Sequence, residues 1–88
     1  MLHMINKAPD HPRFQLCLHA LVPGDTLILT ESAVLALTDT AFAPPCPTFA
    51  LAADVNARGL NALATPEWLI DYSGWVRITA DHQQSVNW

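Results

Sequence analysis

The stretch Val22-Pro23-Gly24-Asp25-Thr26-Leu27-Ile28-Leu29-Thr30 contains the clearest indication of the fold. Its Pro-Gly pair stops a preceding helix, and the five residues from Thr26 to Thr30 predict a strand. The apolar run Leu27-Ile28-Leu29 is continuous, which is typical of a sheet covered on both faces. Such sheets are mostly parallel, and their strands are connected by helices. The stretch therefore predicts an α/β fold.

A first strand and a helix are predicted before this stretch. The apolar run from Leu2 to Asn6 leads into Lys7-Ala8-Pro9, as expected of a buried strand followed by a loop. Pro12 suits the first turn of a helix because its missing N–H costs nothing there. One apolar helical face then follows at Phe14, Cys17, Leu18 and Leu21. Strand, helix and strand in this order predict parallel pairing through a right-handed crossover.

The rest of the chain continues this alternation. We expect a short helix at Glu31–Leu37, a loop at Thr38–Thr48, a strand at Phe49–Ala52, a brief helix that Asp54 caps and Gly59 ends, a strand at Trp68–Asp71, and a helix capped by Ser73 that runs to about Asp81. The tail Gln83–Trp88 is mostly polar and is assigned no element. Without a repeat or a linker, residues 1–88 are predicted to form a single domain with a mainly parallel sheet and helices on both faces.

Composition narrows the possible partners. Of the 88 residues 51% are hydrophobic and 14% are charged, more apolar character than so small a domain can bury, so we expect an oligomer. The net charge is −4 and the four strong bases are scattered, which argues against direct nucleic-acid binding. No signal peptide and no stretch long enough to span a bilayer is evident, so we expect a cytoplasmic protein with free cysteines.

Three blocks, in this order and at these spacings, carry a family resemblance. They are Met1-Leu2-His3-Met4-Ile5-Asn6-Lys7-Ala8-Pro9, Ala53-Asp54-Val55-Asn56-Ala57-Arg58-Gly59-Leu60 and Ile70-Asp71-Tyr72-Ser73-Gly74-Trp75-Val76-Arg77-Ile78-Thr79. With these blocks the chain resembles the TusB/DsrH family, small subunits of cytoplasmic sulfur-relay complexes. The resemblance covers most of the chain and is poor from Ala33 to Thr48.

The resemblance implies a DsrEFH-like fold, a small three-layer α/β sandwich, and a set of partners. In that family three related subunits, B, C and D (or H, F and E), form a heterohexamer. It accepts sulfur from a persulfide donor and passes it toward 2-thiouridine at the tRNA wobble position, or toward sulfur oxidation. We therefore expect TusC-like and TusD-like (DsrF-like and DsrE-like) partners. The main catalytic cysteine of such complexes belongs to the D or E subunit, not to this one.

Cys17 is the residue of this chain that could carry sulfur. The resemblance places it on the first helix, where family members from sulfur-oxidising bacteria carry a cysteine. A persulfide carrier needs a thiolate that a partner can reach. Cys17, however, shares its helical face with Phe14, Leu18 and Leu21, where a cysteine behaves as a small hydrophobe. We predict that it is largely buried.

The other candidate residues give weaker signals. Cys46, in Pro44-Pro45-Cys46-Pro47, is predicted to be an incidental surface thiol. The four histidines lack the spacing of a metal site, and the isolated glycines form no phosphate loop, so no metal or cofactor is expected. Within the Leu2-His3 block, His3 is predicted to be a packed or interface residue. Trp88 either docks a partner or folds back on its own domain.

Three hypotheses follow. In the first, the protein is a structural and docking subunit of a sulfur-relay complex without independent catalysis. In the second, Cys17 is a secondary persulfide carrier of the DsrH type in sulfur oxidation. In the third, the protein is a stand-alone homo-oligomer of the same fold. Exposure of Cys17 distinguishes the first two, and the presence of related partner subunits tests the third.

Overall fold

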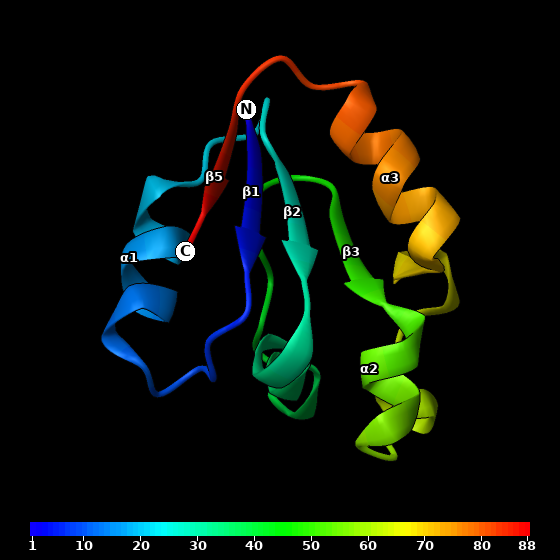
Figure 1. Ribbon diagram of the computed structural model, residues 1–88. Helices are drawn as coiled ribbons and strands as arrows, with labels where there is room; N and C mark the ends of the chain where they lie inside the picture. Colours follow the sequence, from blue (N-terminus) through cyan, green and yellow to red (C-terminus); the bar gives the residue numbers. More distant parts are fainter.

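The computed structural model describes residues 1–88 and contains one five-stranded parallel sheet (Figure 1). The strand order is β4-β3-β2-β1-β5. The strands are β1 (Leu2–Ile5), β2 (Thr26–Leu29), β3 (Thr48–Leu51), β4 (Leu69–Ile70) and β5 (Ser85–Asn87). Every pairing is parallel, which confirms the predicted α/β class with strands near Leu2, Leu27, Phe49 and Leu69.

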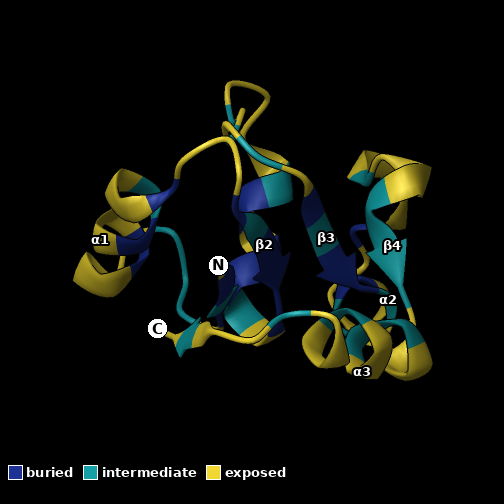
Figure 2. Cartoon of the chain, turned by 90° about the horizontal axis from the view of Figure 1, so that it is seen from above, coloured by how far each residue is buried: buried dark blue, intermediate teal, exposed yellow.

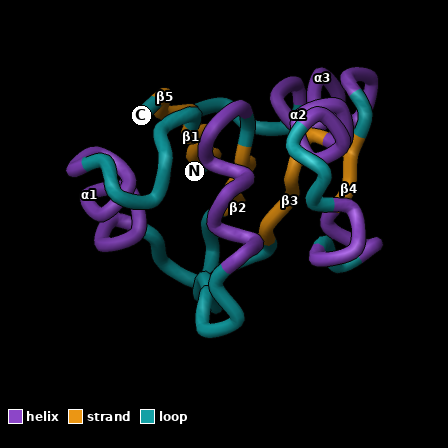
Figure 3. Tube along the Cα trace, turned by 90° about the horizontal axis from the view of Figure 1, so that it is seen from below, coloured by secondary structure: helices purple, strands orange, loops and turns teal.

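Helices connect these strands. They are the α-helices α1 (Pro12–Ala20), α2 (Ala52–Ala57) and α3 (Tyr72–Ala80) and the 3-10 segments η1 (Glu31–Thr38), η2 (Asn61–Leu63) and η3 (Pro66–Trp68). Viewed from either end of the strands, α1 and α3 lie on opposite sides of the sheet (Figures 2 and 3). The sheet is thus the middle of three layers. None of the helices combines the length and the hydropathy that a membrane crossing requires.

The strand register divides the core between the two faces. His3 pairs with Leu27 and Ile5 with Leu29, so these side chains share the face that α1 covers. There the main hydrophobic cluster joins Leu27 and Leu29 to Phe14 and Cys17 of α1. The buried strand centre is dark in Figure 2, whereas the outer sides of the helices are exposed.

The opposite face is less completely covered. Leu2, Ile28 and Leu51 are fully buried there, but α3 contains no buried residue. Trp75 of α3 approaches the sheet, and its Nε1–H donates to Sδ of Met4 at 3.3 Å. Helix α3 therefore covers this face while it keeps a large exposed side.

Strand β5 is the main departure from the predicted elements. The sequence predicts no element in the tail, yet Ser85–Asn87 pairs with β1 in the register Leu2↔Ser85 to Met4↔Asn87. A three-residue edge strand with one apolar side chain, Val86, carries no distinct sequence pattern. Its register is set by contact with β1, which is a tertiary effect.

Two predicted helix caps were wrong. Helix α2 begins at Ala52, so Asp54 lies inside its first turn and accepts the backbone N–H of Glu31 at 2.7 Å. Helix α3 is capped by Asp71 and not by Ser73, because Oδ1 of Asp71 accepts the N–H of Gly74 at 2.7 Å. Gly59 ends the α2 turn as predicted, with a φ of 67° that glycine adopts without strain.

Candidate functional site

Helix α1 holds Cys17 in the interior of the protein. The helix begins after His11, whose Nδ1 accepts the backbone N–H of Arg13 at 3.0 Å, and Pro12 occupies its first turn. Cys17 lies in the middle of the helix and faces the sheet, with only 1% of its surface exposed. The predicted burial of Cys17 is confirmed.

This burial determines the chemistry of the Cys17 thiol. Desolvation, assisted by the charge that Cys46 would carry, raises the pKa of Cys17 to about 12. The position offers no helix N-terminus to stabilise a thiolate. At neutral pH the side chain is therefore a protonated, inaccessible thiol in this conformation.

Cys46 is not the surface thiol that its loop predicted. It is half-buried and packs against the same hydrophobic cluster as Cys17. Burial, and then the negative charge of Asp25, raise the pKa of the Cys46 thiol. The proline-rich segment Pro44–Pro47 predicts an exposed loop, but in the structure its cysteine packs against the apolar side chains of the core. The fold thus brings the two cysteines to one region, and neither is set up as a nucleophile.

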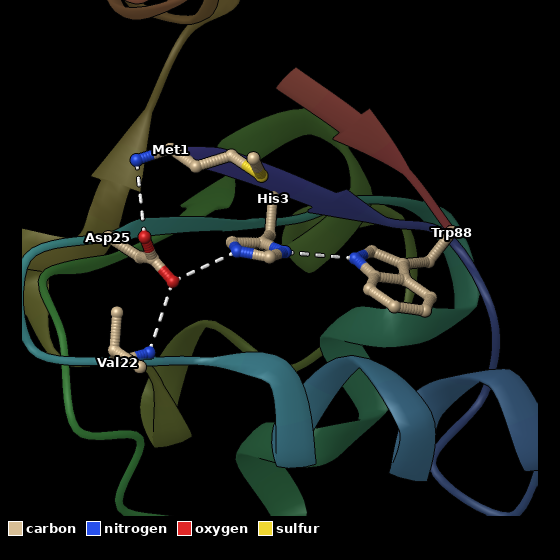
Figure 4. Close-up of polar contacts among 5 residues, drawn as sticks. All are labelled: Met1, His3, Val22, Asp25 and Trp88. Atoms are coloured by element: carbon tan, nitrogen blue, oxygen red, sulfur yellow. Dashed lines mark hydrogen bonds and ion pairs between the residues drawn. The ribbon is translucent and has the colours of Figure 1, made fainter. Parts of the chain in front are cut away.

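A polar network crosses the start of the sheet, and His3 is at its centre (Figure 4). His3 is buried, and its Nε2 lies 3.0 Å from Oδ2 of Asp25. On the other side of the ring, the indole N–H of Trp88 donates to Nδ1 of His3 at 3.1 Å. Because Nδ1 is the acceptor, neutral His3 carries its proton on Nε2 and donates it to Asp25.

Asp25 joins this network to the chain on either side of it. Its Oδ1 lies 3.1 Å from the Met1 amino group, and its Oδ2 accepts the backbone N–H of Val22 at 3.0 Å. The hydrogen bond from Val22, followed by those from the Met1 amino group and His3, lowers the pKa of Asp25 against the opposing effect of burial. The carboxylate is fully engaged, and no buried polar side-chain atom in the structure lacks a partner.

This Asp–His pair cannot act as a general base in the conformation observed. A catalytic histidine needs one ring nitrogen free to take a proton from a substrate. Here both nitrogens of His3 are occupied, one by Asp25 and one by Trp88. The network therefore fastens the two neighbouring strands and the tail together. His3 is a packed residue, as predicted.

The sequence does not single out Asp25, and it allows two roles for Trp88. The Leu2↔Thr26 register places the residue before β2 beside the start of β1, but no sequence pattern gives that register. Trp88 folds back on its own domain, where its ring stacks with His3 at a centroid distance of 6.1 Å. The remaining histidines are dispersed, and no three His, Cys, Asp or Glu side chains form a metal-binding group.

Comparison with known proteins identifies the family. The family model described as "DsrH like protein" matches residues 7–85. Protein TusB of Pectobacterium carotovorum subsp. carotovorum (strain PC1) is 32% identical over 99 aligned residues, and Protein TusB of Escherichia coli (strain K12) is 33% identical over 95. Both alignments cover all of this chain and all of the relative.

A solved structure supports the fold independently. The solution NMR structure of protein Tm0979 from Thermotoga maritima superposes with a TM-score of 0.67 at 21% identity. The superposition covers 96% of this chain and 97% of that one. Sequence and fold agree with the three blocks from which the resemblance was drawn. The chain belongs to the TusB/DsrH family of sulfur-relay proteins.

Proposed function

We propose that this protein is a structural and docking subunit of a cytoplasmic sulfur-relay complex that supports 2-thiouridine formation at the tRNA wobble position. TusC-like and TusD-like subunits would be its partners, and the main catalytic cysteine would belong to the TusD-like subunit. Membership of the TusB/DsrH family supports the pathway.

The burial of Cys17 is the observation that carries the docking role. In persulfide transfer a cysteine thiolate attacks the terminal sulfur of a donor persulfide, breaks the S–S bond and releases the donor thiolate. Cys17 is closed to a partner and stays protonated at neutral pH, because burial raises its pKa to about 12. Both properties favour the docking hypothesis over the persulfide-carrier hypothesis.

The exposed side of α3 supports association. Tyr72 and Val76 are 59% and 68% exposed, and a shallow apolar hollow of about 400 Å³ lies beside Trp75, Val76, Thr79 and Ala80. Aromatic and aliphatic side chains of this kind form the centres of protein interfaces. The net charge of −4, with only four dispersed strong bases, is unfavourable for binding tRNA without partners.

Thiol labelling tests the role of Cys17. Separate samples of the native protein, alone and with its two partner subunits, are treated either with a maleimide or with a persulfide donor, and each cysteine is followed by mass spectrometry. We expect Cys46 to react at least about tenfold faster than Cys17, because only Cys46 is partly exposed. We also expect no sulfur to be added to Cys17, and Cys17→Ala to support thiolation like the wild-type protein.

Two results would contradict the proposal. Labelling of Cys17 as fast as Cys46, or the added mass of one sulfur atom on Cys17, would favour the persulfide carrier of the DsrH type. Purification of the native protein as a homo-oligomer, with neither partner attached, would favour the stand-alone hypothesis.

A further inference from the structure

A small crevice opens at the carboxyl ends of β1, β2 and β5. Figure 3 views the sheet from this end of its strands. The chain runs from β1 through β2 and β3 to β4 on one side and returns to β5 on the other side of β1. In open parallel sheets, ligands bind at such a reversal of strand order, outside the carboxyl ends. The crevice is lined mainly by Met4, Asn6, Thr30, Glu31, Trp75 and Asn87.

The crevice is lined by hydrogen-bond acceptors, one of them a carboxylate, and by no Lys or Arg side chain. Glu31 is exposed, its carboxylate makes no hydrogen bond or ion pair in the structure, and the Asn87 side chain has no partner either. The Trp75 N–H is already donated to Met4, so its indole contributes aromatic surface. Two bases lie nearby, and neither lines the crevice. The Nζ of Lys7 is held by Oδ1 of Asn6 at 2.6 Å, and the Arg13 guanidinium is engaged by Trp88, whose carbonyl accepts its Nε–H at 2.7 Å.

Glu31 is held in its place by an unusual backbone conformation. Its φ of 50° is in the left-handed region, and it is the one non-glycine residue of the structure with a positive φ. The Asp54 carboxylate stabilises this turn by accepting the Glu31 N–H at 2.7 Å. Glycine would meet the backbone requirement with less strain, so the turn itself does not account for a glutamate side chain at the mouth of the crevice.

The volume of the crevice limits what it can hold. It encloses about 180 Å³, whereas pockets for drug-sized ligands and cofactors occupy about 300 to 1,000 Å³. A nucleotide or flavin does not fit, but one long side chain does. A free carboxylate, an amide oxygen and an indole suit a planar cation, because a guanidinium pairs with carboxylates and stacks on aromatic rings.

We propose that this crevice binds an arginine side chain presented by a protein partner. Its guanidinium would pair with the Glu31 carboxylate, donate a hydrogen bond to the Asn87 amide oxygen and lie against the Trp75 indole. The inference does not depend on the sulfur pathway, because it concerns only a binding site of the folded chain.

The probe for this site is N-acetyl-L-arginine amide, and the matched control is N-acetyl-L-citrulline amide, which has nearly the same shape without the charge. Binding is followed by ¹H–¹⁵N NMR of the full chain, in which the indole N–H of Trp75 and the side-chain amide of Asn87 report on the crevice. We expect saturable shifts of these two signals with the arginine probe at millimolar concentrations, on the order expected for a single side chain. The citrulline probe should cause no saturable shift.

Variants locate the site. Glu31→Gln should weaken arginine binding about tenfold, because it removes the negative charge that strengthens the hydrogen bond to the guanidinium. Glu67→Gln removes another exposed acid, in η3, and should leave binding unchanged. Glu31→Gly relieves the left-handed strain, so it should melt no lower than the wild-type protein and still lose binding.

The proposal is overturned if arginine amide produces no saturable shift, if citrulline amide binds equally well, or if Glu31→Gln binds as tightly as the wild-type protein. A melting temperature of Glu31→Gly at or above that of the wild-type protein would rule out unfolding as the cause of lost binding in that variant.

Discussion

At the scale of single residues, Cys17 shows how position within a helix decides what a thiol can do. Its neighbours in the core are apolar, and the charge that Cys46 would carry disfavours ionisation further. A thiol in such surroundings packs as a small hydrophobe. Cys17 therefore contributes to the stability of the folded protein. Because its thiol ionises less readily in the folded state than in the unfolded state, this contribution changes with pH.

We predict that Cys17 makes the folded state less stable as the pH rises above about 9. The pKa of Cys17 is raised from 9.0 to about 12, so between these values the unfolded chain holds fewer protons than the folded one. Stability from this group is complete below pH 9 and is lost as the pH rises toward 12, by about 1 kcal/mol at pH 10. Urea unfolding of the wild-type protein and Cys17→Ala at pH 8 and pH 10 measures it.

Cys17→Ala provides the control, because it keeps Cys46 and every other titrating group. The variant should be less stable at pH 8 and should lose less stability than the wild-type protein between pH 8 and pH 10. Identical losses in both proteins would show that Cys17 ionises freely in the folded state.

At the scale of elements, β5 depends on the residue that follows it. The backbone N–H of Trp88 donates to the Met4 carbonyl at 2.8 Å, and the Trp88 carbonyl accepts Nε–H of Arg13 at 2.7 Å. The Arg13 guanidinium also lies 5.9 Å from the centroid of the Trp88 ring. One residue thus connects the tail to both β1 and α1.

We predict that Trp88→Ala lowers the free energy of unfolding by about 2 kcal/mol, less than for a fully buried tryptophan because Trp88 is only half-buried. Trp88→Phe keeps an aromatic ring but leaves Nδ1 of His3 without its donor, so it should lie between Trp88→Ala and the wild-type protein. Guanidinium unfolding measures both variants, and hydrogen exchange of the β5 amides should accelerate in the same order. Unchanged stability of Trp88→Ala would mean that the tail is not fastened through its indole.

The elements also show which features of the fold could be predicted from the sequence. Strands β1 and β2 and helix α1 were predictable because continuous apolar runs and helical spacing reflect burial directly. Strand β5 and the contacts of Asp25 were not, because both depend on the register between segments far apart in the chain. Cys17 could be placed in the core because it belongs to the helical apolar spacing of α1. Cys46 could not, because its burial depends on how a loop packs against segments far away in the chain.

At the scale of the whole molecule, the two sides of the sheet differ in how well they are covered. The α1 side holds the main hydrophobic cluster, whereas α3 has no buried residue and carries Tyr72 and Val76 on its outer side. Exposed apolar side chains scattered singly are normal in soluble proteins, but neighbouring ones on a single helix next to a hollow indicate a contact surface. The α3 side is therefore where we expect partner subunits to bind.

We predict that Val76→Asp weakens co-purification with the TusC-like and TusD-like subunits, by about tenfold or more in affinity, because it places a charge in an apolar contact. The matched control is Leu16→Asp, which introduces the same charge at a 56% exposed position of α1, on the opposite side of the sheet. Neither substitution removes a buried side chain, so both proteins should melt close to the wild-type temperature. Affinity capture of tagged variants with the co-expressed subunits measures the difference. Loss of the partners in Leu16→Asp but not in Val76→Asp would contradict this prediction. It would show that the partners bind at α1, the helix that contains Cys17.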